Sequence, residues 1–249
     1  MSIRDEINNI LTKDPAARSS LEVVLCYPGF HAVMIHRISH FLYQEEFFTA
    51  ARCLSQLGRW FTGIEIHPGA TLGPRVFIDH GMGVVIGETA EVGENSVIYQ
   101  GVTLGAGAAA RKGAETRGVK RHPTLGKNCV VGSGAEIQGA VTVGDNVQVA
   151  SGSIVLKDVP SNSIVVGVPG RVIYKDGQRV SEQVVPDIEA EAIKALKHSI
   201  VELEKRVDIV ARKTGCEEAA LDVTPPGQES ALESTVEDPV DVFLHGAGI

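Results

Sequence analysis

The sequence has 249 residues, of which 43% are hydrophobic, and a formal net charge of −8. This negative charge argues against nucleic acid as a partner, because like charges repel. No run of about 18 apolar residues is present and the N-terminus lacks the apolar stretch of a signal peptide, so we expect neither a membrane span nor export. The cysteines are scattered without C-x-x-C pairs, which favours free thiols in the cytoplasm: Cys26, Cys53, Cys129 and Cys216.

Residues 1–62 are predicted to form a helical cap domain. Between Phe30 and Leu42, apolar residues recur at the three- and four-residue intervals of a helix face. Asp14 and Pro15 have the character of a helix start, with Asp14 as the N-cap and Pro15 at the first helical position. The cap histidines are interpreted as surface residues of an amphipathic helix rather than metal ligands: His31, His36 and His40.

From Ile66 to Val155 an aliphatic residue recurs in steps of six. A period of six fits neither a helix nor an alternating strand, whose periods are about 3.6 and 2. It fits a solenoid in which three steps make one triangular coil and the aliphatic side chains fill the axis. The thirteen positions predict roughly four coils: Ile66, Leu72, Ile78, Ile86, Val92, Ile98, Leu104, Leu125, Val131, Ile137, Val143, Val149 and Val155.

A β-sandwich is the alternative, but its strands recur about every 8 to 12 residues. Glycine directly follows seven of the thirteen aliphatic positions. We expect these glycines at the corners of the coil, in backbone conformations that a Cβ would obstruct. The predicted fold class is therefore α+β: a helical domain, then a left-handed parallel β-helix of hexapeptide repeats over residues 63–175, then a C-terminal helix and a flexible tail.

The six-residue period is interrupted twice, and irregular loops on a rigid scaffold often carry function. The step from Ile78 to Ile86 is eight residues, so His80 can be lifted off the coil surface. The step from Leu104 to Leu125 is 21 residues, which predicts a protruding loop over residues 106–124. An anion is the natural ligand of this loop, because one acid, Glu115, faces five basic residues: Arg111, Lys112, Arg117, Lys120 and Arg121.

After the repeat, residues 176–214 are predicted to contain a helix. Its apolar residues alternate by three and four, which fits either a coiled-coil seam or a helix packed on its own solenoid: Ile193, Leu196, Ile200, Leu203, Val207 and Val210. Residues 215–249 have the composition of a flexible tail that closes on an apolar segment ending in Ile249.

His80 is a candidate general base, since the pKa of an imidazole lies near neutrality. A base of this kind needs a carboxylate on its second ring nitrogen. Asp79 is the sequence neighbour of His80 and is expected to point elsewhere. Glu65 lies 15 residues earlier, near the 18 that would stack it one coil away, so a dyad of Glu65 with His80 is geometrically allowed.

Six segments together give the sequence a family resemblance: Gly63-Ile64-Glu65-Ile66-His67-Pro68, Ile78-Asp79-His80-Gly81, Ile86-Gly87-Glu88-Thr89, Gly101-Val102-Thr103-Leu104-Gly105, Arg121-His122-Pro123 and Gly167-Val168-Pro169-Gly170-Arg171. Through them the chain resembles the bacterial serine O-acetyltransferases, from about Asp14 to Arg171. Hexapeptide steps alone are common to many acyltransferases. The Asp-His-Gly and Arg-His-Pro segments in this order are more specific.

The resemblance implies roles for individual residues. His80 looks like the base that deprotonates the serine hydroxyl for direct attack on acetyl-CoA, and Glu65, where some relatives carry aspartate, like its orienting carboxylate. Asp14 and Asp79 match positions that hold the serine amino group and hydroxyl, while Arg121 and His122 match those that hold its carboxylate. Candidate contacts of the co-substrate acetyl-CoA are Gly105, Ala106, Ser133 and Arg171. No bound cofactor and no metal are expected.

The resemblance also implies partners. Members of the family form homotrimers, some of which pair into a dimer of trimers, and a C-terminal isoleucine such as Ile249 inserts into O-acetylserine sulfhydrylase. Two rival functions stay open at this point. One is acetyl transfer to a sugar or other hydroxyl acceptor, and the other is a γ-type carbonic anhydrase that binds zinc through His67, His80 and His122.

Overall fold

The computed structural model describes residues 2–180 and 188–214. The predicted tail, including Ile249 and Cys216, lies outside the described residues. The chain divides into two units, residues 1–181 and 182–249, and each is treated by itself. Within the described part of the chain, no helix is both long and apolar enough to cross a membrane.

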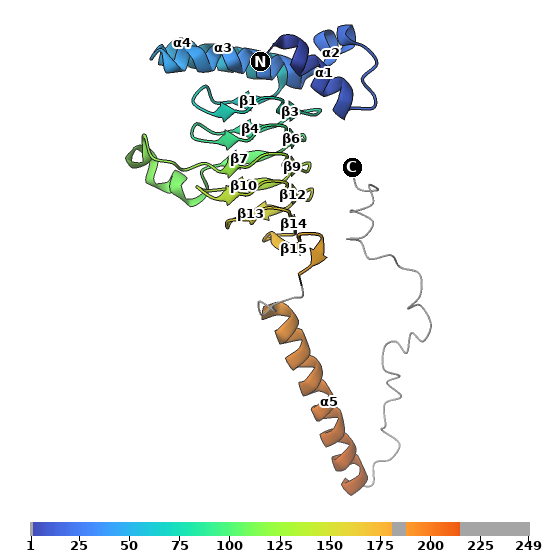
Figure 1. The fold of residues 1–249 in the computed structure, drawn as a ribbon. Coiled ribbons are helices and arrows are strands. Elements are labelled where there is room, and N and C mark those ends of the chain that lie inside the picture. The colour runs from blue at the N-terminus through green and yellow to red at the C-terminus, as the bar shows by residue number, and fades with distance from the viewer. Residues whose placement is uncertain (1, 181–187, 215–249) are drawn as a thin grey trace. The chain divides into compact units, whose positions relative to one another are not determined.

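Four helices precede the first strand, and they form the cap in blue at the N-terminal end of the ribbon in Figure 1. Ser2 and Asp5 form a capping box at the start of the first helix, and Gly63, with φ of 72°, ends the fourth. The helices are α1 (Ile3–Lys13), α2 (Ser20–Cys26), α3 (Pro28–Gln44) and α4 (Phe48–Thr62).

The strands that follow stack into three faces, parallel from β1 to β14, which confirms the predicted β-helix, and β15 and β16 extend one face as antiparallel strands. Face A contains β1 (Glu65–Ile66), β4 (Val85–Ile86), β7 (Thr103–Gly105), β10 (Glu136–Gln138) and β13 (Ile154–Val155). Face B contains β2 (Thr71–Leu72), β5 (Glu91–Val92), β8 (Thr124–Leu125) and β11 (Thr142–Val143). Face C contains β3 (Phe77–Ile78), β6 (Val97–Ile98), β9 (Val130–Val131), β12 (Gln148–Val149), β14 (Ser163–Val166), β15 (Arg171–Lys175) and β16 (Gln178–Arg179).

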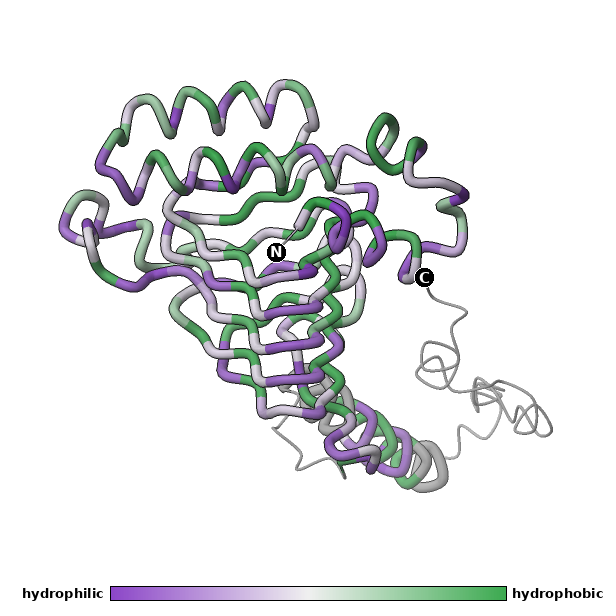
Figure 2. Tube along the Cα trace, turned by 45° about the horizontal axis from the view of Figure 1, so that its top comes forward, coloured by the Kyte–Doolittle hydropathy of each residue, from purple (hydrophilic) through white to green (hydrophobic). Residues whose placement is uncertain are grey.

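The predicted aliphatic positions form the axis of this solenoid. All thirteen lie in strands, and all except the partly buried Leu72 belong to the buried core. Face A has five strands because the thirteen positions make four complete coils and begin a fifth, in agreement with the roughly four coils predicted. In Figure 2 hydrophobic and hydrophilic residues align in columns from one rung to the next, as this register requires.

The expectation for the repeat glycines was wrong in its physical reason. None of the seven glycines that follow an aliphatic position has a left-handed backbone. They are small because the next coil passes close by: a Cβ on Gly93 would meet the carbonyl oxygen of Gly126. The left-handed corner positions are occupied in part by a ladder of side chains joined by hydrogen bonds of 2.7–3.0 Å: Asn95, Asn128, Asn146, Asn162 and Asp176.

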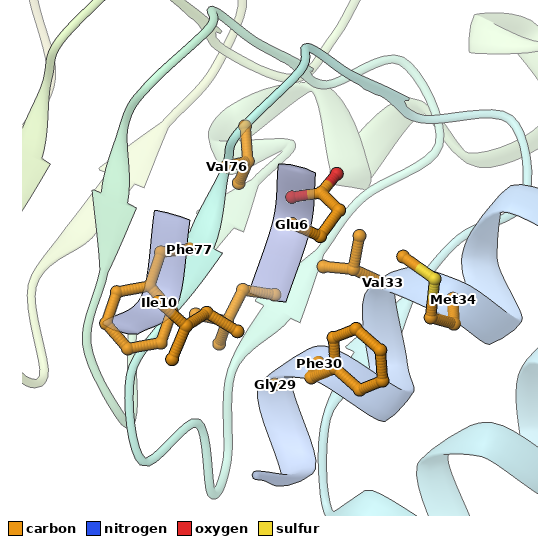
Figure 3. Close-up of a pocket in the computed structure, with 9 residues that line it drawn as sticks. Glu6, Ile10, Gly29, Phe30, Val33, Met34, Val76 and Phe77 are labelled. Atoms are coloured by element: carbon orange, nitrogen blue, oxygen red, sulfur yellow. The ribbon is translucent and has the colours of Figure 1, made fainter. Parts of the chain in front are cut away.

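The cap packs on the first coil through a second apolar cluster formed by Ile10, Val23, Phe30 and Phe77. Glu6 of α1 is buried beside this cluster, next to a cavity of about 10 Å³ that Figure 3 shows in close-up. Burial raises the pKa of Glu6, and its ion pair with Arg37 of α3 acts in the opposite direction. The cap is therefore joined to the solenoid by both apolar and charged contacts.

Two expectations for the cap were wrong. Asp14 does not start a helix: it follows the last residue of α1, and its Oδ1 accepts a hydrogen bond of 2.8 Å from the Ala16 amide. The next helix begins only at Ser20, because Ser19 supplies its N-cap side chain. His36 is not a surface residue, since only 4% of it is exposed.

The second unit contributes one described element, the 27-residue helix α5 (Ile188–Thr214). It includes the predicted seam, and Leu196, Ile200, Leu203 and Val207 are exposed on it. A coiled coil and a helix packed on the solenoid therefore both stay predictions.

Candidate active site

Two corners of the solenoid collect the predicted site residues. Residues 79–84 connect β3 of face C to β4 of face A, and we call this region the C–A corner. Residues 87–90 and the long segment 106–123 connect face A to face B, and we call this region the A–B corner. The two corners lie on opposite edges of face A.

The C–A corner is acidic and carries His80. Asp79 follows β3 and Tyr99 follows β6 one coil further on, so the coil stacking places them together. Tyr27 of the cap brings in Asp14, because its hydroxyl donates to Asp14 Oδ2 over 2.5 Å. The structure thus unites three predicted site residues, Asp14, Asp79 and His80, with two tyrosines that were not predicted.

Titration behaviour reflects this crowding of acids. Burial raises the pKa of Asp79, Asp14 raises it further, and His80 opposes the rise. Burial also raises the pKa of Tyr99, with Asp79 and Asp14 adding to the effect. The pKa of Tyr27 is raised by burial and by its hydrogen bond to Asp14. A cationic ammonium group is the complement of such a corner, since it relieves the repulsion between the two carboxylates.

His80 itself projects from the bulge as predicted, with 75% of its side chain exposed and φ of 56°. Its Nε2 lies 4.0 Å from Asp79 Oδ1, so Asp79 does not point away as the sequence suggested. The peptide that follows is held by a 2.6 Å hydrogen bond from the Gly81 amide to the Asp79 carbonyl. His80 is therefore available to a group outside its own coil.

Glu65 has different contacts within the chain. Its carboxylate oxygens lie 3.4 Å from Arg59 and 3.7 Å from Arg52, both on α4. Glu65 belongs to face A, and 24% of its side chain is exposed. Its role as the orienting carboxylate of His80 stays a prediction.

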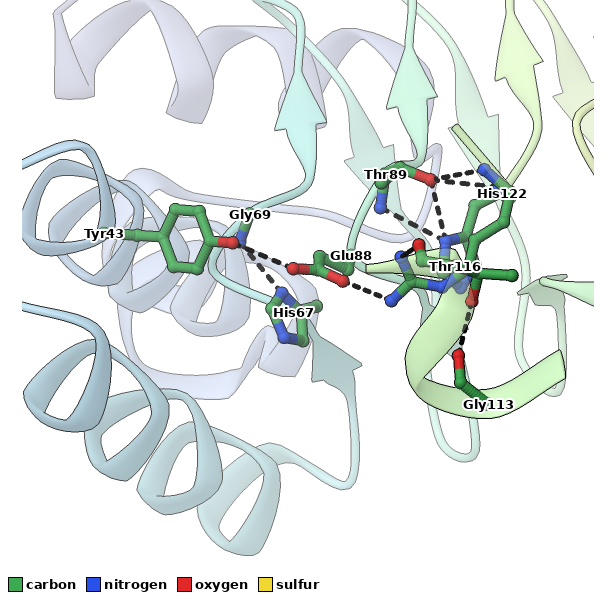
Figure 4. A network of polar contacts seen from close by, with 9 residues as sticks. Tyr43, His67, Gly69, Glu88, Thr89, Gly113, Thr116 and His122 are labelled. Atoms are coloured by element: carbon green, nitrogen blue, oxygen red, sulfur yellow. Dashed lines mark hydrogen bonds and ion pairs between the residues drawn. The ribbon is translucent and has the colours of Figure 1, made fainter. Parts of the chain in front are cut away.

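At the A–B corner a polar network holds Arg121 and His122 (Figure 4). Glu88 forms an ion pair with the Arg121 guanidinium through Oε2 and accepts a 2.9 Å hydrogen bond from the Tyr43 hydroxyl through Oε1. The Thr89 hydroxyl accepts 3.0 Å hydrogen bonds from the backbone amides of Arg121 and His122 and lies 2.9 Å from His122 Nδ1. Arg121 and His122 are thus brought together, and Glu88 and Thr89 hold them in place.

At this corner Arg121 is paired with an ionised Glu88 beside a neutral imidazole. Burial and the neighbouring Arg121 lower the pKa of His122 to about 4, so the imidazole is neutral near pH 7. Although burial raises the pKa of Glu88, hydrogen bonds from Arg121 and Tyr43 outweigh it and hold this pKa below its usual value. A guanidinium beside a neutral imidazole donor suits a carboxylate.

The long loop covers a cavity beside this network. Its residues Gly107–Thr116 form 3₁₀ turns, η1, with a kink at Gly113, and the loop projects from the solenoid in Figure 1. The cavity has a volume of about 690 Å³ and lies between the loop and the cap helices α3 and α4. Its charged lining consists of Arg52, Glu88, Arg117 and Arg121.

The residues predicted to contact acetyl-CoA divide between the two corners. Gly105 ends β7 and Ala106 lines the cavity at the A–B corner. Ser133 follows β9 at the C–A side, where its hydroxyl bonds to Ser151 over 3.1 Å, and Arg171 begins β15. Their roles stay predictions.

The sequence analysis predicted the residues expected to contact the substrate, but it missed those that hold these residues in place. Glu88 and Thr89 lie in a segment that supported the family resemblance, but nothing in their spacing assigned them a task. The sequence analysis assigned no role to Tyr27, which lies between α2 and α3, or to Tyr43 in the last turn of α3. The sequence does not indicate which residue a tyrosine hydroxyl will bond to. Here Tyr27 bonds to Asp14, 13 residues away, and Tyr43 bonds to Glu88, 45 residues away.

The chain is similar to known proteins in both its repeats and its whole length. The models "Bacterial transferase hexapeptide (six repeats)" and "Hexapeptide repeat of succinyl-transferase" match residues 122–157 and 83–109. Serine acetyltransferase of Synechococcus elongatus is 50% identical over 246 residues, which is 96% of each chain. That of Bacillus subtilis is 48% identical over 210 residues, 83% of this chain and 94% of the relative.

Among solved structures, the serine acetyltransferase of Neisseria gonorrhoeae in complex with serine is 37% identical, with a TM-score of 0.63, over 68% of this chain and 66% of that one. A serine acetyltransferase in complex with cysteine is 33% identical, with a TM-score of 0.65, over 70% of this chain and 65% of that one. The alignments span about two thirds of these solved chains.

The stacked hexapeptide coils and the corner site define the class of this protein as a hexapeptide-repeat acyltransferase. Given its identity to relatives over nearly their whole length, the chain belongs to the serine acetyltransferase family. Within the described residues, no group of three or more His, Cys, Asp or Glu side chains is arranged to hold a metal ion.

Proposed function

We propose that the protein transfers the acetyl group of acetyl-CoA to the hydroxyl of L-serine, in cysteine biosynthesis, at active sites shared between the chains of a homotrimer. The observation that carries the shared site is the separation of its two halves. The ammonium-binding acids and His80 lie at the C–A corner, whereas Arg121 and His122 lie at the A–B corner. A small zwitterion cannot touch both corners of one chain, but cyclic packing brings the C–A corner of one protomer to the A–B corner of the next.

In this arrangement each half supplies one part of the recognition. Asp14 and Asp79 hold the serine ammonium group and orient the hydroxyl, while the guanidinium of Arg121 and the imidazole of His122 receive the carboxylate. The hydroxyl then lies against His80, which removes its proton as the oxygen attacks the thioester carbonyl. The tetrahedral intermediate then breaks its C–S bond, and the departing CoA thiolate takes the proton from His80. Glu65 stabilises the imidazolium that forms, and backbone amides of the glycine-rich coils stabilise the oxyanion.

Acetyl-CoA binds along the groove between two solenoids in this proposal. Gly105 and Ala106 line it from one protomer, and Ser133 and Arg171 from the other. The long loop 106–124 closes over it, and its basic residues face the phosphates of CoA.

The tail and the location complete the proposal. The segment that closes on Ile249 binds O-acetylserine sulfhydrylase as an extended peptide. The three described cysteines are free thiols, which supports a reducing compartment such as the cytoplasm.

A steady-state assay of CoA thiol release tests the reaction. With acetyl-CoA and L-serine we expect saturable release, and with sugars in place of serine we expect none. Release that depends on a sugar, and not on serine, contradicts the proposal. Stoichiometric zinc in the purified protein together with CO₂ hydration and no acetyl transfer would favour the carbonic anhydrase alternative instead.

A further inference from the structure

The guanidinium of Arg121 is held by Glu88, which is itself bonded to Tyr43 of the cap, and we call Glu88 and Tyr43 the anchor of Arg121. Arg121 stands at the end of the long loop, and its Nη1 bonds to the Thr116 carbonyl over 3.3 Å. The ion pair with Glu88 fixes the other terminal nitrogen, and Tyr43 of α3 fixes Glu88 in turn. Only 19% of the Arg121 side chain is exposed. The loop therefore ends in a side chain whose direction is set by residues outside the loop.

Charge in this anchor is balanced. Because the pKa of Glu88 is held down by its two donors, Glu88 is ionised and offsets the charge of Arg121. The pair has no net charge, and the adjacent imidazole is neutral. A substrate carboxylate is then recognised by the direction of N–H donors and not by an excess of positive charge.

Thr89 fixes the proton on His122. The Thr89 amide donates to His122 Nδ1 over 3.2 Å, so Nδ1 is an acceptor. In a neutral imidazole the proton then sits on Nε2, which becomes a donor. The ring is also packed against the coil, because a Cβ on Gly87 would meet His122 Nε2 and Cδ2.

We propose that Glu88, Tyr43 and Thr89 are positioning residues that fix Arg121 and His122 as a directional reader of the substrate's carboxylate. They make the enzyme specific for hydroxy amino acids with a free α-carboxylate over the corresponding amides and amino alcohols. The inference deepens the proposed function and rests on it. A buried donor array of this kind penalises an uncharged amide, since its N–H groups would oppose those of the site.

Kinetics with L-serine and L-serinamide test the inference, because the two substrates differ only at the group that is read. The variants are Glu88→Gln, Tyr43→Phe and Thr89→Val in the full-length protein, with Thr89→Ser as the conservative replacement. Glu91→Gln is the matched control: it removes an exposed ion pair with Lys120 at the same corner, 2.8 Å long, without touching Arg121 or His122.

We expect Glu88→Gln to raise KM for L-serine by about tenfold to a hundredfold, as for a weakened hydrogen bond to a charged group. Thr89→Val keeps the backbone amide but loses the hydroxyl that holds the amides of Arg121 and His122, so we expect a rise of about threefold to tenfold, as for loss of hydrogen bonds between neutral groups. kcat and the KM for acetyl-CoA stay within about twofold, and kcat/KM for L-serinamide is unchanged. Tyr43→Phe gives a smaller rise, and Thr89→Ser and Glu91→Gln keep the wild-type KM.

An equal loss of kcat/KM for L-serine and L-serinamide would show a merely structural role and overturn the inference, as would an unchanged KM for L-serine. Tyr43→Phe removes one hydroxyl and keeps the test decisive where the other variants fail to fold. If the wild-type protein does not acetylate L-serine, the proposed function itself fails. If the wild-type protein acetylates L-serine and the variants keep the wild-type KM, only the positioning roles are excluded.

Discussion

His80 combines a break in the repeat, a left-handed backbone and high exposure. A non-glycine residue with positive φ is tolerated where its surroundings enforce it, and such residues concentrate at functional sites. The sequence predicted the position from the eight-residue step alone. The conformation could not be predicted, because it depends on how Gly81 and Gly83, both with positive φ, complete the bulge.

Replacing His80 tests its role as the base. For His80→Ala we expect kcat to fall by about 10²- to 10⁴-fold, because the serine hydroxyl then loses its proton acceptor. The side chain is exposed, so the thermal midpoint should stay near the wild-type value. Turnover close to that of the wild type would exclude His80 as the base.

His36 gives stability a pH dependence. Burial, with a smaller contribution from His40, lowers its pKa to about 3, from an unfolded value of 6.5. As the pH falls below 6.5 the unfolded chain takes up a proton that the folded chain refuses, so acid favours unfolding. Between pH 7 and pH 5 this residue alone should cost about 2 kcal/mol of the free energy of unfolding.

Denaturant unfolding of wild-type protein and of His36→Gln at both pH values measures this contribution. The variant should lose less stability than the wild type on acidification, whatever its stability at pH 7. Parallel losses in the two proteins would show that His36 is not the group responsible.

At the scale of elements, the repeat was the most predictable feature. Each aliphatic position fell in a strand, because a period of six leaves no other regular structure that buries one residue per step. The Asn95 to Asp176 ladder escaped prediction, since its members are separated by 33, 18, 16 and 14 residues and align only after the coils stack. The α1 end at Asp14 was misread because Pro15 fits a loop as well as a helix start.

Coil stacking makes Gly93 sensitive to its smallest substitution. In Gly93→Ala the new Cβ meets the Gly126 carbonyl, and the coils must separate locally. We expect a loss of about 1–3 kcal/mol in the free energy of unfolding, as for overpacking in a core. Thermal unfolding measures it, and Glu91→Ala, at an exposed side chain two residues earlier, is the control. Equal midpoints for the two variants would contradict close stacking as the reason for glycine here.

At the scale of the whole molecule, the shared site predicts complementation between two inactive proteins. His80→Ala damages the C–A corner and Arg121→Ala the A–B corner, so a mixed trimer has one intact site where the two good corners meet. Random assortment of equal amounts should restore about one quarter of wild-type activity. The measurement is turnover after co-refolding or co-expression. Activity no higher than that of the separate variants would place the whole site in one chain.

The tail is predicted to act independently of catalysis. Deleting Ile249 should leave acetylation of serine intact and abolish binding to O-acetylserine sulfhydrylase, because the apolar side chain that the partner would hold is lost and glycine takes its place at the end of the peptide. Titration calorimetry with the sulfhydrylase measures the binding. Undiminished heat of binding for the deletion variant would exclude this mode of capture.

Helix α3 joins the two corners of one chain. Gly29 near its start packs against the backbone of Ile78, and His40 near its end lies 2.7 Å from the Pro68 carbonyl. Tyr27 precedes the helix and Tyr43 lies in its last turn, each bonded to a carboxylate of a different corner. In the proposed trimer these corners serve two different catalytic centres. A helix about 25 Å long then links two neighbouring centres around the ring, so a substitution that shifts α3 is expected to disturb the acid corner of one centre and the arginine corner of the next.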